Sequence, residues 1–280
     1  MNLQSLHTHS HFCDGHGAME DYLQAALRHG LTAYGPSSHS PVPWSNNYSM
    51  ALADVPRYVA EARRLREAYH GLIEVYLGLE LDFRPDLYPF YRQHIFPHGF
   101  DYFIGSVHLV GELDGRPWSF EDRLSTFIQV VAERYGGDAR GLLTDYYALV
   151  RQVVEWPEVT ILGHLDRIRV HNAGDAFFSE EAAWYVDLVE DVLDAVQRSG
   201  KMVELNTAGW RKTNAGPNPS PWIVRRCAER GIPMCLTPDA HRVEQIAFQY
   251  AAGIDLLQAS GHRYVNVLKD GQWTPTPLGR

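Results

Sequence analysis

Seven short apolar segments recur along this chain, separated by longer segments in which apolar residues follow the period of a helix. Alternation of this kind is typical of α/β proteins with parallel strands, because each helix carries the chain back to begin the next strand. Seven consecutive units predict a closed or nearly closed parallel barrel of the (β/α)7 type, with an open doubly wound sheet as the competing architecture. The predicted strands are residues 3–9, 31–35, 73–80, 101–108, 159–164, 202–206 and 233–237.

The segments between the strands carry helix signals of their own. Gly30 is a typical helix stop and Ser179 a typical N-cap. An insertion at about 109–157 contains an Asp114-Gly115 turn, which predicts a hairpin, and a pair of helices. No repeat or long linker divides the chain, so we expect one domain over residues 1–280. Helices are expected at about 20–29, 53–69, 87–96, 121–135, 142–155 and 179–198, with another after the loop 217–221 and a last one before a tail hairpin around 270–271.

Residues of metal-binding types follow most of these strands. His7 and His9 are two positions apart in the first strand, so their side chains leave the same face about 7 Å apart along the backbone. The carboxyl ends of barrel strands meet at one rim, where barrel enzymes carry their active sites. A single histidine there is more often a hydrogen-bonded core residue, but six of the seven strands end in such residues, and burying them unpaired is costly. The pattern predicts a metal centre, whose further candidates are His39, Glu80, His108, His164, Asp239 and His241.

Composition narrows the classes of function. The chain has 34 acidic and 25 basic residues and a net charge of -9, which argues against a nucleic-acid partner held through its phosphates. No apolar run approaches the roughly 18 residues of a membrane span, and we expect no membrane partner and no signal peptide. Three scattered cysteines, Cys13, Cys227 and Cys235, are too few for a disulfide framework. We therefore expect a soluble, cytoplasmic protein whose function lies in a small-molecule site.

Seven short motifs follow one another: Leu-His-Thr-His-Ser, Ser-Ser-His-Ser-Pro, Gly-Leu-Glu-Leu-Asp, Gly-Ser-Val-His, Leu-Gly-His-Leu-Asp, Glu-Leu-Asn-Thr-Ala-Gly and Pro-Asp-Ala-His. In this order they resemble the polymerase-and-histidinol-phosphatase (PHP) superfamily, most closely its monofunctional histidinol-phosphatase branch. The resemblance extends over about residues 3–245 and implies a distorted TIM-like (β/α)7 barrel. It also implies a centre of three divalent transition-metal ions and hydrolysis of L-histidinol phosphate in histidine biosynthesis.

The resemblance further implies how the strand-end residues divide among three ions. The first ion would be held by His7, His9, Glu80 and Asp239. The second would share Glu80 and be held also by His108 and His164. The third would take His39, His241 and one residue of the loop after the first strand, for which we choose His16 and keep Asp14 as the alternative. Imidazole and carboxylate ligands suit zinc, iron or manganese, and the absence of cysteine ligands disfavours a structural zinc.

The same residues suggest a chemistry. Three divalent ions against two carboxylates leave a locally positive site that attracts phosphate, and ions about 3.5–4 Å apart activate water for in-line attack on phosphorus. The candidate proton donor for the leaving group is Asp14, or His241 acting through a bound water. Arg211 and Arg169 follow the sixth and fifth strands and are candidate phosphate-binding residues, because a planar guanidinium suits phosphate. Asp82 could receive the substrate's ammonium group or orient a ligand histidine.

Two other functions stay open on these grounds. A PHP-type phosphoesterase or exonuclease acting on nucleotides would need a basic groove, which the net charge of -9 argues against. A non-catalytic metal-binding module is disfavoured by candidate ligands at every expected position. A homo-oligomer is compatible with each of the three functions.

Overall fold

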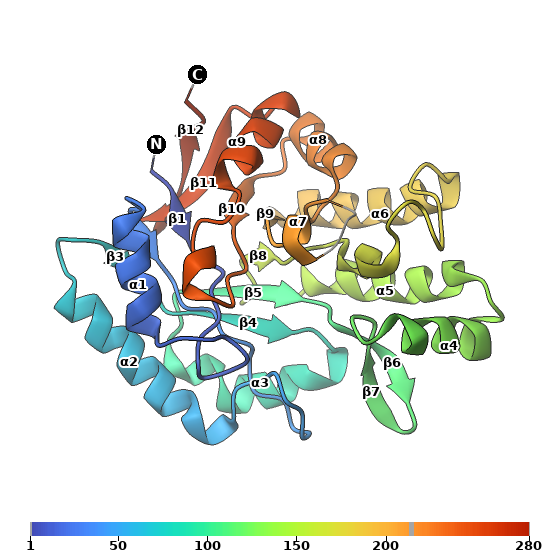
Figure 1. The fold of residues 1–280 in the computed structure, drawn as a ribbon, viewed down its shortest axis with the longest axis horizontal. Coiled ribbons are helices and arrows are strands. Elements are labelled where there is room, and N and C mark those ends of the chain that lie inside the picture. The colour runs from blue at the N-terminus through green and yellow to red at the C-terminus, as the bar shows by residue number, and fades with distance from the viewer. Residues whose placement is uncertain (1, 213–215, 280) are drawn as a thin grey trace.

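Two parallel β-sheets lie at the centre of the computed structural model, which describes residues 2–212 and 216–279 (Figure 1). The smaller sheet has the order β1-β2-β3, and its strands are Gln4–Ser5, Ala33–Tyr34 and Glu74–Val75. The larger sheet has the order β10-β9-β8-β5-β4. In chain order its strands are β4 (Gly78–Asp82), β5 (Tyr102–Ser106), β8 (Ile161–Leu162), β9 (Met202–Asn206) and β10 (Met234–Thr237).

Helices cover the outside of these sheets, as the sequence pattern predicted. Helix α1 packs on β2, α2 on β3, α5 on β5 and α9 on β10, and Figure 1 shows this succession around the strands. Each α-helix of the described chain starts or stops within a few residues of a predicted boundary, except the four-residue α7 and the last helix, α9, for which no boundary was predicted. The helices are α1 (Met19–Arg28), α2 (Val55–Ala68), α3 (Tyr88–His94), α4 (Leu124–Tyr135), α5 (Ala139–Val153), α6 (Ala183–Ser199), α7 (Gly209–Lys212), α8 (Pro221–Arg230) and α9 (Tyr250–Ala259).

Isolated bridges connect the two sheets at the carboxyl ends of their strands. Thr8 pairs with Ala240 beyond β1 and β10, and His39 pairs with Glu80 between the segment after β2 and strand β4. Backbone hydrogen bonds extend these contacts, such as Ser40 N–H to the Glu80 carbonyl at 2.8 Å. The fold is therefore α/β with parallel sheets, and its regular strands form two sheets rather than one continuous ring.

The predicted third strand is the clearest departure from the sequence expectation. Residues 73–80 were expected to form one strand, but Glu74–Val75 pairs with β2 in the smaller sheet and Gly78–Asp82 pairs with β5 in the larger one. The segment changes neighbours where it passes Tyr102. A Cβ atom on Gly78 would lie 2.2 Å from Cζ of the Tyr102 ring, so only glycine fits at this close approach.

Tyr102 also crosses to the strands of the other sheet. Its hydroxyl donates a hydrogen bond to the Leu6 carbonyl at 2.6 Å and to the Gly35 carbonyl at 3.2 Å. A Cβ atom on Gly35 would lie 2.3 Å from that hydroxyl oxygen. One tyrosine from β5 thus satisfies buried carbonyls beyond β1 and β2, and two glycines make room for it.

Two antiparallel hairpins complete the structure. One lies in the predicted insertion and consists of β6 (Leu109–Leu113) and β7 (Arg116–Ser119); the other closes the chain with β11 (Tyr264–Lys269) and β12 (Gln272–Pro277). Each turns through an Asp-Gly pair in which both residues have positive φ, at 114–115 and 270–271, as the turn signals predicted. Of the helices in the described ranges, none combines the length and the apolar character that crossing a membrane requires.

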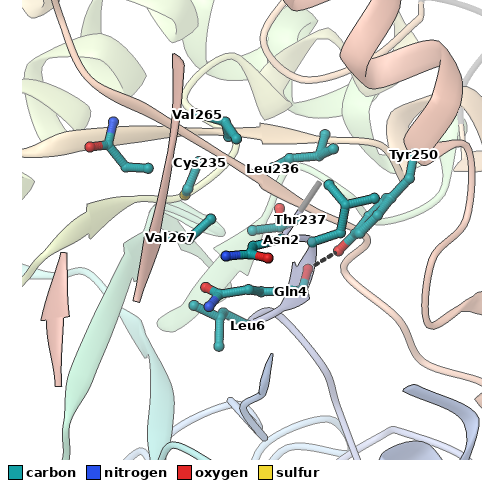
Figure 2. A pocket seen from close by; sticks show the side chains of 11 residues that line it. Asn2, Gln4, Leu6, Cys235, Leu236, Thr237, Tyr250, Val265 and Val267 are labelled. Atoms are coloured by element: carbon teal, nitrogen blue, oxygen red, sulfur yellow. Dashed lines mark hydrogen bonds between the residues drawn. The ribbon is translucent and has the colours of Figure 1, made fainter. Parts of the chain in front are cut away.

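The C-terminal hairpin packs against the amino ends of the central strands. Gln4 accepts a hydrogen bond from Leu268 N–H at 2.8 Å and donates its side-chain amide to the Leu268 carbonyl. Tyr250 donates to the Gln4 carbonyl at 2.6 Å, a hydrogen bond drawn in Figure 2. The cavity left there measures about 10 Å³, which is room for at most one water molecule. Leu268 belongs to a buried cluster lined by both sheets, with Leu6, Ala33, Tyr76, Tyr102, Ile104, Ile161, Met202 and Cys235.

Candidate metal centre

A cluster of buried imidazoles and carboxylates lies at the carboxyl ends of the parallel strands. Strand ends that are far apart in the sequence converge here, as predicted. The strand-end residues in it are His7, His9, His39, Glu80, His108, His164, Asp239 and His241. Among the described residues, three groups have ligand atoms within 4.8 Å of one another: His9, Asp14, His39 and His241; His7, His9 and Asp239; and His39, Glu80 and His108.

Glu80 lies in the middle of the cluster, and both of its carboxylate oxygens face histidines. Oε2 lies 3.3 Å from His7 Nε2, 3.4 Å from His9 Nε2 and 3.1 Å from His39 Nδ1. Oε1 lies 3.1 Å from Nε2 of His164 and 3.4 Å from Nε2 of His108. A carboxylate that reaches five imidazoles through two oxygens has the geometry of a ligand shared between ions.

Several polar atoms of the cluster are buried without any hydrogen-bond partner in the described chain. They are His7 Nε2, His9 Nε2, Asp14 Oδ1, His39 Nδ1, Glu80 Oε2 and His164 Nδ1. Orphaned buried polar atoms are rare because each carries a desolvation cost, and an ion is one of the few groups that removes it. Most of these atoms point toward one another, so the residues present fit divalent cations.

The charges of the cluster shift the pKa values of its members. Burial alone would lower the pKa of His7, but the carboxylates of Glu204, Glu80 and Asp239 raise it well above its ordinary value. Burial would raise the pKa of Glu80, and the surrounding histidines lower it well below its ordinary value. Burial and neighbouring imidazoles lower the pKa of His9. Glu80 therefore stays anionic at neutral pH, and the cluster presents negative charge to a cation.

Two buried carboxylates behind the cluster hold its histidines in place. Glu204 in β9 lies 2.8 Å from His7 Nδ1 and accepts the backbone N–H of His164 at 2.7 Å. Asp82 Oδ1 lies 2.5 Å from His108 Nδ1. A carboxylate on one ring nitrogen fixes the tautomer and leaves the other nitrogen free to bind a metal. The geometry therefore favours the orienting role of Asp82 over the ammonium-binding one.

Glu204 was missed by the sequence analysis. A signal for it was present, because an acidic residue inside an otherwise apolar strand must find a buried partner. It stands two positions before Asn206, and both side chains reach toward the cluster, where Asn206 Nδ2 donates to Glu204 Oε1 at 3.1 Å and to Asp239 Oδ2 at 3.3 Å.

The structure does not bring His16 into the cluster. Its side chain is exposed, and its backbone N–H pairs with the His241 carbonyl at 2.7 Å. Asp14 lies beside the cluster, with carboxylate oxygens 3.5 Å from His241 Nε2, 3.7 Å from His9 Nδ1 and 3.9 Å from His39 Nε2. The loop turns so that Asp14 faces inward and His16, two residues later, faces solvent, and this geometry favours Asp14, the alternative, over His16. Burial would raise the pKa of Asp14, but His241 and the other histidines lower it below its ordinary value.

Of the two predicted arginines, Arg211 lies beside the cluster. Its Nη2 donates to the Asp239 carbonyl at 3.3 Å, its guanidinium lies over the Phe248 ring at 5.3 Å, and its Nη1 is buried with no hydrogen-bond partner in the described chain. Burial, opposed by Asp239, lowers the pKa of Arg211. A half-buried guanidinium with an unused donor at this position can receive an anion.

Arg169 has other partners. It is 3% exposed, and it donates to Asp166 Oδ2 at 2.9 Å, to Glu180 Oε1 at 2.6 Å and to the Pro217 carbonyl at 3.2 Å. Two carboxylates neutralise it, so this geometry gives no support to a phosphate-binding role.

Arg167, which the sequence analysis did not single out, is buried two positions before Arg169. Its Nε donates to Glu121 Oε2 at 2.8 Å. Burial lowers the pKa of Arg167, but Glu121 and then Asp239 raise it above its ordinary value. The charge of Arg167 in turn lowers the pKa of Arg211. Arg167, Arg211 and Asp239 are thus close enough to act on one another's charge. Spacing alone could not separate Arg167 from Arg169, because the segment Arg167–His171 forms a 3₁₀ helix.

The chain was compared with known proteins. Residues 5–208 match the model of the PHP domain. A protein from Deinococcus radiodurans named "Probable histidinol-phosphatase" is 35% identical over 92% of this chain and 94% of its own length. The histidinol-phosphatase of Bacillus subtilis is 25% identical over 89% of this chain and 97% of its own length. The crystal structure of histidinol phosphate phosphatase from Lactococcus lactis, in complex with zinc, L-histidinol and phosphate, superposes with a TM-score of 0.74 at 20% identity, covering 98% of this chain and 99% of that one.

Proposed function

The chain belongs to the PHP domain family, and from that premise we propose that it is a histidinol-phosphatase, a phosphoric monoester hydrolase. The reaction is the hydrolysis of L-histidinol phosphate to L-histidinol and phosphate, in histidine biosynthesis. The observation that carries the proposal is the cluster around Glu80, in which five imidazole nitrogens face one carboxylate beside an arginine with an unused buried donor. A biosynthetic role of this kind agrees with action in the cytoplasm.

We propose three ion sites that share side chains. The first is formed by His7, His9, Glu80 and Asp239, and the second by Glu80, His108 and His164. The third is formed by His39, His241 and Asp14 rather than His16. Zinc, iron and manganese all suit these ligands. When bound, divalent ions here supply activated water and neutralise phosphoryl charge, as in other multi-metal phosphatases.

The chain's own residues bind the phosphate group of the substrate and supply the proton for its leaving group. Arg211 donates to the phosphoryl oxygens through Nη1, and the positive charge of Arg167 adds to the attraction. The lowered pKa of Asp14 makes it a poor proton donor, which leaves His241, 3.5 Å from Asp14 and acting through a bound water, to supply the proton that the leaving alkoxide needs. The overall charge of -9 keeps polyanions such as nucleic acids away, whereas a single small phosphate meets a local positive field.

We also infer that the central strands form a distorted TIM-like (β/α)7 barrel in one domain with an insertion at about 109–157. The bridges Thr8–Ala240 and His39–Glu80 support closure, because each joins a strand end of one sheet to a strand end of the other. Closure of this kind explains why ligands from both sheets share one rim.

Steady-state hydrolysis of histidinol phosphate beside an aryl phosphate and a nucleotide tests the proposal. We expect kcat/KM for histidinol phosphate to exceed that for either of the others. A higher kcat/KM for the nucleotide would make the chain a nucleotide phosphoesterase instead. Absence of turnover on all three by the zinc-, iron- and manganese-loaded protein would leave a metal-binding module.

A further inference from the structure

The segment that follows His39 folds back onto the metal cluster. Residues 40–50 leave the strand end and return, so that Met50 N–H donates to the His39 carbonyl at 3.2 Å. Asn46 holds the turn, because its Oδ1 accepts the backbone N–H groups of Tyr48 at 3.0 Å and Ser49 at 2.8 Å. The loop therefore has a defined shape, and it aims the Tyr48 side chain inward.

The Tyr48 hydroxyl is connected to the candidate ligand His108 through the carboxylate of Asp82. It donates to Asp82 Oδ2 at 2.8 Å, and the other oxygen of that carboxylate lies 2.5 Å from His108 Nδ1. The second ring nitrogen of His108, Nε2, faces Glu80 Oε1 at 3.4 Å and His164 Nε2 at 3.2 Å. Asp82 is 1% exposed, so no bulk water can replace the tyrosine hydroxyl without opening the site.

The Tyr48 ring contacts a second candidate ligand. It meets the His39 imidazole edge to face, with ring centres 5.3 Å apart and an interplanar angle of 85°. The His39 and His108 rings are themselves 5.1 Å apart at 81°. One side chain from the loop thus braces the histidines of two different ion sites, one through its hydroxyl and the other through its ring.

We propose that Tyr48 is a positioning residue that sets the metal affinity of this centre. Its hydroxyl keeps Asp82 oriented so that His108 presents Nε2 to the ion, and its ring limits the rotation of His39. Partners of metal-binding histidines typically change affinity 10- to 100-fold when removed. The inference rests on the proposed function only in that these histidines hold ions.

The test compares Tyr48→Phe with the wild type in a zinc titration against a chromophoric chelator. We expect one equivalent of zinc to bind about 10- to 100-fold more weakly in the variant, because only the hydroxyl is lost. Tyr48→Leu, which also removes the ring, should weaken a second equivalent. Tyr135→Phe is the matched control: its hydroxyl donates to Asp145 Oδ2 at 2.9 Å, between α4 and α5, and its loss should leave every equivalent unchanged.

A second readout separates positioning from catalysis and from a merely structural role. At saturating zinc, kcat of Tyr48→Phe should return to the wild-type value, while the zinc concentration for half-maximal rate rises by the same factor as the affinity loss. Wild-type zinc affinity in Tyr48→Phe, or a loss no larger than in Tyr135→Phe, would overturn the proposal. A kcat that stays low at saturating zinc would also overturn it. A wild-type protein that binds zinc but hydrolyses no phosphate ester would refute the proposed function and leave this inference standing.

Discussion

At the scale of single residues, Glu80 is the central side chain of the candidate metal site. The carboxylate is 1% exposed, and the histidines around it keep its pKa well below the ordinary value. Its two oxygens face five imidazole nitrogens, so the same side chain that holds the negative charge of the site also contacts most of the candidate ligands.

We expect Glu80→Gln to lose metal and most of its activity together. The amide keeps the size of the side chain but removes the charge and one ligand oxygen that two ions would share. Elemental analysis of the purified variant, alongside kcat, measures both effects, and far-ultraviolet circular dichroism should show the fold unchanged. Near-normal kcat with full metal content would refute the shared-ligand role.

Arg211→Ala should lower kcat/KM by about 10- to 200-fold for every phosphate ester, since a charge-assisted hydrogen bond contributes about 1.5–3 kcal/mol. Metal content should not change, because arginine is not a ligand. Arg169→Ala serves as the contrast: it removes the cationic partner of the buried Asp166, which keeps hydrogen bonds from Asn218 and Ser220, and should destabilise the fold by about 1–3 kcal/mol. A loss confined to histidinol phosphate would instead put Arg211 beside the leaving group.

His262 makes stability depend on pH outside the metal site. Burial lowers the pKa of its imidazole, whose Nε2–H donates to the Val224 carbonyl at 3.0 Å. Below about pH 6.5 the unfolded chain takes up a proton that the folded one resists, so this contribution to stability is present above that pH and is lost as the pH falls. Urea unfolding at pH 7.5 and 5.5 should show a smaller difference for His262→Gln than for the wild type. The exposed His70 offers the control, and His70→Gln should keep the wild-type difference.

At the scale of elements, helices were predicted closely and strands less so. Helix boundaries follow from local signals such as Gly30 and Gly200, which end α1 and α6. Strands depend on partners elsewhere in the chain, and the segment expected at 73–80 divides between two sheets because Tyr102 from β5 meets it at Gly78. The orientation of the loop after β1 was hard to predict for the same reason: which residue faces the cluster depends on a backbone pairing of His16 with Arg242 that no local pattern reveals.

The C-terminal hairpin should matter to stability although it is remote from the site. Leu268 in β11 is 2% exposed and closes the buried cluster between the sheets. Leu268→Ala should therefore lower the free energy of unfolding by about 2–5 kcal/mol, as other buried leucine truncations do. Urea denaturation gives the value, and kcat per folded molecule should be unchanged. Lys269→Ala, an exposed change on the same strand, should cost less than about 0.5 kcal/mol; equal losses would refute the role of Leu268.

At the scale of the whole molecule, the strand-end cluster joins parts of the chain that share few regular hydrogen bonds. Its members come from both sheets, which in the described residues are joined by isolated bridges and by the hydrogen bonds of Tyr102 rather than by regular strand pairing. The convergence of strand ends was predictable because parallel units of one handedness must place their carboxyl ends together. Of the two supporting carboxylates, Asp82 was among the candidates for orienting a ligand histidine, whereas Glu204 was missed because its partners His7 and His164 lie on other strands.

Removing the ions should therefore destabilise the entire fold and not the rim alone. A ligand that binds only the folded state adds about 2.7 kcal/mol at a free concentration of 100 times Kd. Calorimetry at buffered free zinc should show Tm rising steadily with zinc concentration and falling after chelation. A Tm independent of zinc, in protein shown to bind it, would mean that the sheets hold together without the cluster.

The crossing of Tyr102 also bears on how such a chain can vary among its relatives. Its ring occupies the space that a methyl group at position 35 or 78 would need, and its hydroxyl serves carbonyls on two other strands. A lineage that replaced either glycine would first have to give up the tyrosine, and one that lost the tyrosine would be released from both glycines. Glycine should therefore be found at positions 35 and 78 wherever position 102 is tyrosine.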